Sequence, residues 1–135
     1  ETEFECDFSD HIELELWRKY VLIGATAAST VLFQKPLGEI SATTYGKSLI
    51  IEIHEECKKI VLSKGYDIGI EATNYNLKLI TDKDSLLKAS MLRDFESGKK
   101  TECEHILGYL IDLAEKNNIQ CDLIKAAHTR IQVGL

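Results

Sequence analysis

The stretch from Ile12 to Phe33 constrains the fold most, because it contains no proline and its apolar residues occupy most of a helical circumference. A helix on the surface of a protein carries a single apolar stripe, whereas one that is apolar nearly all round has to be covered by other elements. We therefore predict a long, heavily buried helix over Ile12–Phe33. Its second half, Gly24–Thr30, consists of small residues. Small residues allow another backbone or a ligand to come close, and we favour tight packing as the explanation.

The rest of the chain continues in helical patterns. Pro36 and Gly38 stop the first helix, and Asp67–Glu71 is expected to be a loop or a short extended piece. Apolar spacing and capping residues predict further helices over these segments: Lys47–Lys64 with Gly65 as a left-handed C-cap, a short one around Tyr75–Ile80 broken near Asp82, Asp84–Gly98, Thr101–Asn117 with a Thr101/Glu104 capping box, and one from Asp122 onward. The sequence thus predicts an all-α bundle of about six helices in one domain.

Charge and hydropathy exclude several classes of partner. The net charge is -6, and acidic residues crowd the first fifteen positions, which would repel a phosphate backbone. No apolar run approaches the length of a membrane span, and the acidic start lacks the basic region of a secretory signal. We expect no nucleic-acid or membrane partner and a cytoplasmic location.

The cysteines give little support for a metal site. Cys6, Cys57, Cys103 and Cys121 are widely spaced and form no CxxC pair, so ordinary thiols are expected. His54 with Cys57, and Cys103 with His105, are the candidate ligand pairs. Nothing in their spacing shows that they converge, and we predict no metal.

Two motifs point to a family. Leu16-Trp17-Arg18-Lys19 is followed by Pro36-Leu37-Gly38-Glu39, and Ser90-Met91-Leu92-Arg93-Asp94 is followed by Thr101-Glu102. In order and spacing, these motifs resemble the opening helix and the substrate-cleft signature of the C-terminal domain of ketopantoate reductases (2-dehydropantoate 2-reductases). The resemblance extends from about Asp10 to about Gln132.

The resemblance implies roles for four residues. Lys19 would be the catalytic acid that protonates the 2-oxo oxygen, and Glu102 would accept a hydrogen bond from a substrate hydroxyl. Ser90 would bind the substrate, at its carboxylate, and Asp94 would give a further hydrogen bond to the site or between helices. A lysine partly buried beside Trp17 would have a lowered pKa suited to proton donation. Without the resemblance, Lys19 reads as a snorkelling surface group and Glu102 as an acid that favours a helix N-terminus.

The chain departs from the family pattern at two positions. Asparagines that bind the substrate usually stand four and eight residues after the catalytic lysine, where this chain has Ile23 and Ala27. Each unpaired polar group of a bound hydroxy acid would cost roughly 1 to 3 kcal/mol. We therefore expect a substrate more hydrophobic than ketopantoate, or weak activity toward ketopantoate.

The resemblance also implies how the chain is organised. Residues 10–135 would form the C-terminal substrate-binding and dimerisation domain, and residues 1–9 would be linker or a strand remnant of the interdomain junction. The chain has no GxGxxG, so the Rossmann domain that binds NADPH in the family is expected to be absent from it. We expect part of an NADPH-dependent 2-oxo acid reductase of pantothenate biosynthesis that forms a possible homodimer. The alternatives are a catalytically silent dimerisation or ligand-binding module with the same fold, and an unrelated helical adaptor.

Overall fold

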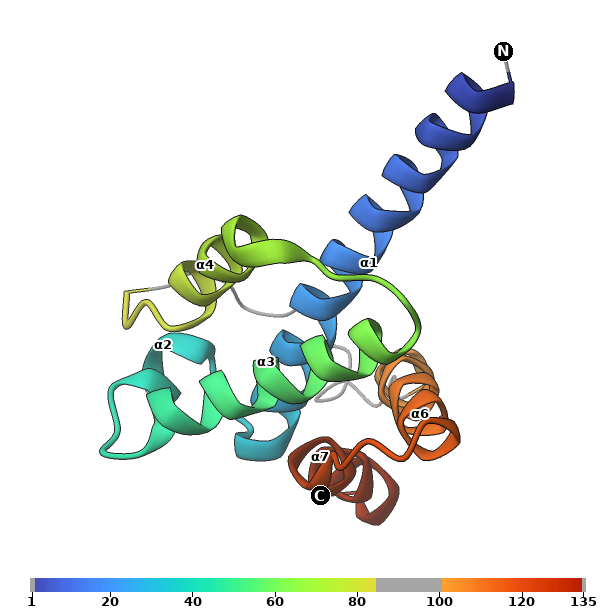
Figure 1. Cartoon of the computed structure of the whole chain (residues 1–135). Helices are drawn as coiled ribbons and strands as arrows, with labels where there is room; N and C mark the ends of the chain where they lie inside the picture. Colours follow the sequence, from blue (N-terminus) through green and yellow to red (C-terminus); the bar gives the residue numbers. More distant parts are fainter. Residues whose placement is uncertain (1, 85–100, 135) are drawn as a thin grey trace.

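The computed structural model describes residues 2–84 and 101–134, and all secondary structure in them is helical. Six helices follow one another along this part of the chain, labelled as in Figure 1: α1 (Thr2–Phe33), α2 (Leu37–Ser41), α3 (Gly46–Ser63), α4 (Gly69–Ile80), α6 (Thr101–Lys116) and α7 (Asp122–Val133). The predicted all-α class is confirmed. The helix predicted over Asp84–Gly98 lies almost wholly outside the described residues.

Helix α1 is the central element of the bundle. It contacts each of the other five helices, and most extensively α3. Its small residues Ala25, Ala27 and Ala28 are completely buried, which confirms tight packing over Gly24–Thr30. A Cβ atom added at Gly24 would lie only 2.8 Å from Cδ1 of Leu110 on α6. The small-residue half of α1 therefore lets α6 and α3 approach the central helix closely.

Helix α1 begins ten residues earlier than predicted, at Thr2 rather than Ile12. The segment expected to be linker or strand is therefore helical in conformation. The sequence explains this, because no proline or glycine interrupts it before Gly24 and nothing stops helix propagation toward the N-terminus. Figure 1 shows these first turns projecting beyond the other helices. Their assignment to an interdomain junction stays a prediction.

The end of α3 is capped as predicted by Gly65. This residue has a φ of 108°, and its N–H donates to the carbonyl of Leu62 at 2.8 Å. The N–H of Tyr66 donates to the carbonyl of Val61 at 3.2 Å. Together these bonds form a Schellman motif, which satisfies two carbonyls at the helix end and turns the chain toward α4.

Helix α4 begins inside the segment that was predicted to be a loop. Its first residue is Gly69, and the Asp67 carboxylate accepts a hydrogen bond from the Gly69 N–H at 2.9 Å. This local bond organises the turn that precedes the helix. The helix then ends at Ile80, in agreement with the predicted break near Asp82. The short helix α2 was not predicted, since Pro36 and Gly38 indicated only a turn.

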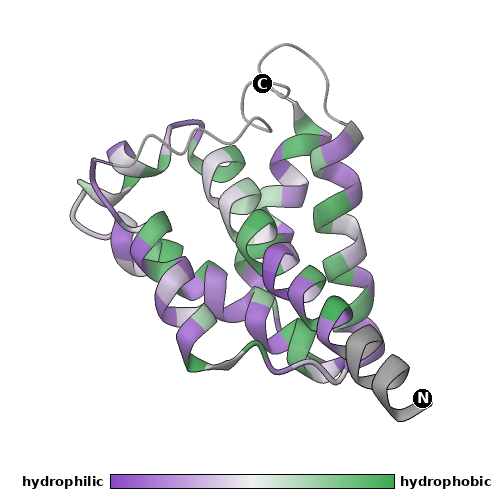
Figure 2. Ribbon diagram, turned by 90° about the horizontal axis from the view of Figure 1, so that it is seen from above, coloured by the Kyte–Doolittle hydropathy of each residue, from purple (hydrophilic) through white to green (hydrophobic). Residues whose placement is uncertain are grey.

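The core lies where the apolar faces of the helices meet. Figure 2 shows hydrophobic residues gathered along the inner sides of the helices. The predicted stripe of α6 is confirmed, with Cys103, Leu107, Leu110 and Ala114 fully buried, and α7 contributes Ala127 and Ile131. The side chains of Cys57, Cys103 and Cys121 are buried in this core. Within residues 2–84 and 101–134, no helix is both long and apolar enough to cross a membrane.

Candidate functional site

The predicted catalytic lysine lies at a pocket between α1 and α4. The pocket has a volume of ≈ 460 Å³, within the range of small-molecule sites. Helix α1 lines one wall and helix α4 the other, with Glu15, Arg18, Lys19, Leu22, Glu71, Ala72, Tyr75 and Asn76. Because Lys19 and Leu22 are one turn apart on α1, they face the same side. A site of this size suits a small acid.

The two cations of the pocket differ in what they bind. Arg18 forms an ion pair with Glu15, with Nη1 and Oε1 2.6 Å apart, and its Nε donates to the Ile68 carbonyl at 3.1 Å. The ion pair lies within α1, whereas the bond to Ile68 ties α1 to the residue that precedes α4. Lys19 is exposed and has no hydrogen-bond or ion-pair partner within the described parts of the chain. The partial burial expected for Lys19 is therefore not found, and its ammonium is the pocket cation available to an anionic ligand.

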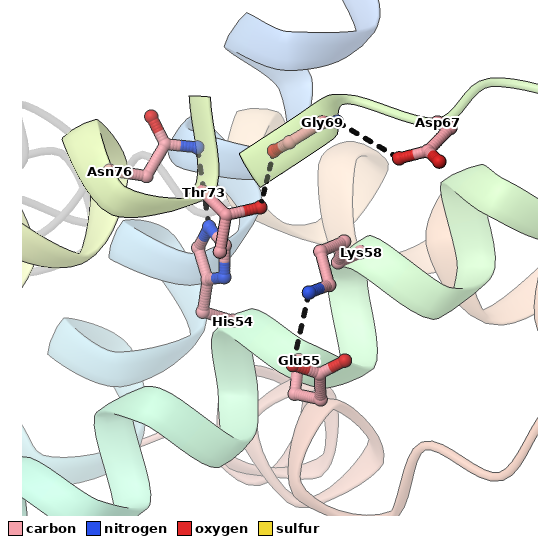
Figure 3. Close-up of polar contacts among 7 residues, drawn as sticks. All are labelled: His54, Glu55, Lys58, Asp67, Gly69, Thr73 and Asn76. Atoms are coloured by element: carbon pink, nitrogen blue, oxygen red, sulfur yellow. Dashed lines mark hydrogen bonds and ion pairs between the residues drawn. The ribbon is translucent and has the colours of Figure 1, made fainter. Parts of the chain in front are cut away.

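A buried polar pair lies behind the α4 wall. Asn76 lines the pocket but is only 4% exposed, and its side-chain Nδ2 lies 3.2 Å from Nε2 of His54 on α3. Figure 3 shows the amide nitrogen of Asn76 directed at the imidazole and the amide oxygen directed away from it. Since an amide nitrogen can only donate, Nε2 accepts and the proton of the neutral imidazole is on Nδ1. The pair fixes the orientation of the Asn76 carboxamide.

The environment of His54 keeps its ring neutral. Burial lowers the pKa of His54 to about 4, and the nearby Lys58 ammonium acts in the same direction, while Glu55 opposes it. Figure 3 shows Lys58 paired with Glu55, at 3.4 Å. His54 is only 1% exposed, so a charged imidazolium there would lose its hydration. At neutral pH His54 is therefore a hydrogen-bond acceptor for Asn76.

Of the other predicted site residues, only Glu102 belongs to the part of the chain that the structure describes, and it does not lie at the Lys19 pocket. Glu102 is exposed on the first turn of α6 and is not among the described residues that line the Lys19 pocket. Ser90 and Asp94 lie outside the described residues, as does the side chain of Thr101. The roles of Glu102, Ser90 and Asp94 stay predictions that rest on the resemblance.

The two positions that depart from the family pattern lie in different environments. Ile23 is 40% exposed, whereas Ala27 is completely buried in the small-residue half of α1. Neither residue lines the Lys19 pocket. Only Ile23 therefore presents an apolar surface to solvent one turn from Lys19.

Trp17 belongs to a ring cluster rather than to the Lys19 pocket. Its ring stacks at centroid distances of 5.6 Å on Tyr20, 5.6 Å on Tyr66 and 6.2 Å on Tyr109, and Lys64 Nζ lies 5.8 Å from it. Trp17 is half-buried and lines a separate pocket with Tyr20 and Tyr66. Its ring contacts join α1, α6 and the segment after α3. These contacts favour a role for Trp17 in packing the core over a role in excluding water from Lys19.

The candidate metal pairs have other roles in the structure. His54 uses Nε2 for Asn76, and burial raises the pKa of the Cys57 thiol far above its ordinary value, so no thiolate forms. Cys103 is buried while His105 is exposed. No cluster of three or more metal-ligating side chains occurs among the described residues.

Asn76 is one of several pocket residues that were not predicted from the sequence. A signal was present, because Thr73, Asn76 and Ile80 occupy the buried stripe of α4 while His54 interrupts the apolar stripe of α3. Buried polar side chains need hydrogen-bond partners, and two of them on neighbouring helices can most simply bond to each other.

Known proteins match nearly the whole length of this chain. The family model described as "Ketopantoate reductase PanE/ApbA C terminal" matches residues 11–133. "Uncharacterized oxidoreductase YkpB" of Bacillus subtilis (strain 168) is 32% identical over 129 residues, which cover 96% of this chain and 43% of that protein. The 2-dehydropantoate 2-reductase of Salmonella typhimurium is 27% identical over 110 residues, covering 82% of this chain and 35% of that protein.

The corresponding reductase of Archaeoglobus fulgidus is 24% identical over 110 residues, covering 82% of this chain and 36% of that protein. The chain thus spans less than half the length of these relatives. No solved structure matches the chain significantly.

Proposed function

Because the chain belongs to the ketopantoate reductase family, whose C-terminal model it matches over residues 11–133, we propose that it forms the substrate-binding part of an oxidoreductase that reduces a 2-oxo acid to a 2-hydroxy acid. The observation that carries this proposal is the position of Lys19, an exposed ammonium without a protein partner among the described residues, at a pocket of ≈ 460 Å³. Ketopantoate is the first substrate to test.

Lys19 would act on the oxo oxygen. As the carbonyl carbon is reduced, negative charge develops on that oxygen, and a fixed cation beside it lowers the barrier. Lys19 would also hold the proton that the product alkoxide takes up. Arg18 is already engaged by Glu15 and the Ile68 carbonyl, so it supports the wall of the pocket and leaves this chemistry to Lys19.

The hydride would come from a nicotinamide cofactor, which we propose is NADPH. The described residues do not fit a dinucleotide, since they are helical and lack the strand, glycine-rich turn and helix that cradle a pyrophosphate. We therefore propose that this chain acts together with a dinucleotide-binding domain. The length of the relatives, more than twice that of this chain, supports such an arrangement.

The test is NADPH oxidation by the full-length protein with ketopantoate, compared with a Lys19→Ala variant. Loss of a general acid typically lowers the rate by roughly 10²- to 10⁴-fold, so a loss of this size is expected. Lys59→Ala is the matched control, because Lys59 is exposed on α3 and does not line the pocket. Undiminished turnover by Lys19→Ala would refute the role of this residue.

A second candidate function is a catalytically silent binding module with the same fold. Ile23 and Ala27, in place of two family asparagines, favour it. The full-length protein would then bind a 2-oxo acid, or dimerise through this domain, without oxidising NADPH. Absence of turnover with ketopantoate and with other 2-oxo acids would select this alternative.

A further inference from the structure

Two side-chain hydrogen bonds join helix α4 to the other helices within the described parts of the chain. At the N-terminal end, Nε of Arg18 on α1 donates to the carbonyl of Ile68, the residue that precedes α4, at 3.1 Å. In the second half of α4, Nδ2 of Asn76 lies 3.2 Å from Nε2 of His54 on α3. Because α4 forms one wall of the Lys19 pocket, these bonds, together with apolar packing, fix the position of that wall relative to Lys19.

Arg18 is bound on two sides of its guanidinium. Its Nη1 lies 2.6 Å from Oε1 of Glu15, one turn earlier on α1, while its Nε bonds to Ile68, which is completely buried. The donors of a guanidinium form a rigid planar fork, so the bond to the carboxylate also sets the direction of the Nε–H. A lysine has a single ammonium in place of this fork and does not reproduce both bonds. Arg18 therefore links α1 rigidly to the start of α4.

We propose that Arg18 is a positioning residue of the Lys19 pocket, which controls the affinity for the substrate by holding the α4 wall at a fixed distance from Lys19. Lys19 itself is on α1 and does not move with α4. Ala72 and Tyr75 are on α4, so their contacts with a bound acid depend on where that helix lies. The inference rests on the proposed function and adds a residue whose effect on the reaction passes through α4.

The charge of Arg18 is less well placed to act on the substrate directly. Its guanidinium is already paired with Glu15, whereas the Lys19 ammonium has no ion-pair or hydrogen-bond partner among the described residues. An anion that enters the pocket has to compete with the Glu15 carboxylate for Arg18, but it meets no such competitor at Lys19. The role of Arg18 is therefore assigned to its geometry.

Two variants separate the geometry of Arg18 from its charge. Arg18→Met retains the apolar stem and removes both bonds, whereas Arg18→Lys retains the stem and the positive charge but loses the fork. Both variants are expected to fold, because the Arg18 and Glu15 side chains are 34% and 47% exposed and such ion pairs add little to global stability. Lys59→Met is the matched control, since Lys59 is exposed on α3 and does not line the pocket.

The first measurement is hydrogen exchange of the full-length protein, followed for each peptide by mass spectrometry. In Arg18→Met we expect the amides of Gly69–Ile80 to exchange on the order of tenfold faster, because α4 loses a hydrogen bond from a charged donor and opens more often. Arg18→Lys should change in the same direction by a smaller factor. The amides of α6 and α7 should exchange as in the wild type, and Lys59→Met should leave α4 unchanged.

The second measurement is the kinetics of NADPH oxidation with ketopantoate. We expect KM to rise about tenfold in Arg18→Met with kcat within about threefold of the wild type, because binding contacts are lost while Lys19 stays in place. Global destabilisation would instead lower kcat through the fraction of folded protein and leave KM unchanged. Loss of electrostatic attraction would raise KM only in Arg18→Met, so a KM that is also raised in Arg18→Lys, by about threefold or more, is the decisive result.

Two results overturn the inference. One is exchange of α4 at the wild-type rate in Arg18→Met, and the other is an Arg18→Lys variant with the KM of the wild type. If the wild type oxidises no NADPH with ketopantoate, the proposed function fails, and the exchange of α4 then decides by itself whether Arg18 holds this wall.

Discussion

The Glu56 carboxylate on α3 accepts a hydrogen bond from the backbone N–H of Ile124 on the first turn of α7, at 3.0 Å. Its second oxygen accepts the N–H of Leu123 at 3.2 Å. These are two of the amides that a helix leaves unpaired at its N-terminus, and the capping residue Cys121 makes no side-chain bond to them. A residue 68 positions away in the sequence thus caps α7 and fastens it to α3.

Removal of this cap should destabilise the chain. Glu56→Ala should lower the free energy of unfolding by about 1 to 2 kcal/mol, as for other lost caps, measured by urea unfolding of this chain. Glu56→Gln keeps an acceptor oxygen but loses the charge that interacts with the helix dipole, so we expect a smaller loss of about 0.5 kcal/mol. Glu52→Ala, an exposed position on the same helix, is the control. Equal stability of Glu56→Ala and Glu52→Ala would contradict the capping role.

The neutral, buried His54 should make stability depend on pH. Its folded-state pKa is lowered to about 4 from an ordinary value of 6.5, so the unfolded chain binds the proton more readily. Stability is complete above about pH 6.5 and decreases as the pH falls toward 4, by roughly 3 kcal/mol.

The measurement is the free energy of unfolding between pH 7 and pH 4, compared in wild type and His54→Gln. Burial raises the pKa of Glu56, which acts in the opposite direction, but Glu56 contributes to both proteins and cancels in the difference. The variant should show a flatter pH dependence. Parallel curves would mean that His54 is not held neutral.

Substitution by alanine should have opposite effects on stability at Gly24 of α1 and at Gly108 of α6. At Gly24 the added Cβ would meet Leu110 Cδ1 at 2.8 Å and Cys57 Sγ at 3.4 Å, and both side chains are fully buried. Overpacking there should outweigh the gain in helix propensity, with a net loss of about 1 to 2 kcal/mol. At Gly108 the nearest atom is His128 Nε2 at 3.8 Å, so Gly108→Ala should stabilise by about 0.5 to 1 kcal/mol. The melting temperatures of the two variants give the comparison. A higher melting temperature for Gly24→Ala would show that Leu110 on α6 moves aside at little cost.

Asparagine should be tolerated at position 23 but should destabilise the fold at position 27. Ile23→Asn replaces a side chain that is 40% exposed, so the stability should change by no more than about 0.5 kcal/mol. Ala27→Asn forces a larger polar group into a completely buried site and should cost about 3 kcal/mol or more. Chemical denaturation distinguishes the two, and similar losses would mean that position 27 has room that the structure does not show.

Local sequence was sufficient to predict most helices because their determinants are neighbours in the chain. The cap of α3 consists of bonds from Gly65 to Leu62 and from Tyr66 to Val61, all close in the chain. The stripe of α6 follows from a spacing of three and four residues. The start of α1 was missed because the apolar pattern begins at Ile12, whereas no proline or glycine stops the helix before that residue. The start of α4 was missed because Asp67 and Gly69 were expected to lie in a loop, whereas the hydrogen bond between them forms the turn from which the helix begins.

The sequence by itself determined the all-α class, the long buried helix and the family, since each depends on residue types at fixed spacing. Only the tertiary structure decided that Lys19 is exposed, that Ala27 is out of reach of the pocket, and that Asn76 lines it with His54 behind. His54 and Asn76 are 22 residues apart on different helices. Their meeting depends on how α3 and α4 pack, and apolar periodicity identifies a buried face without specifying which partner will cover it.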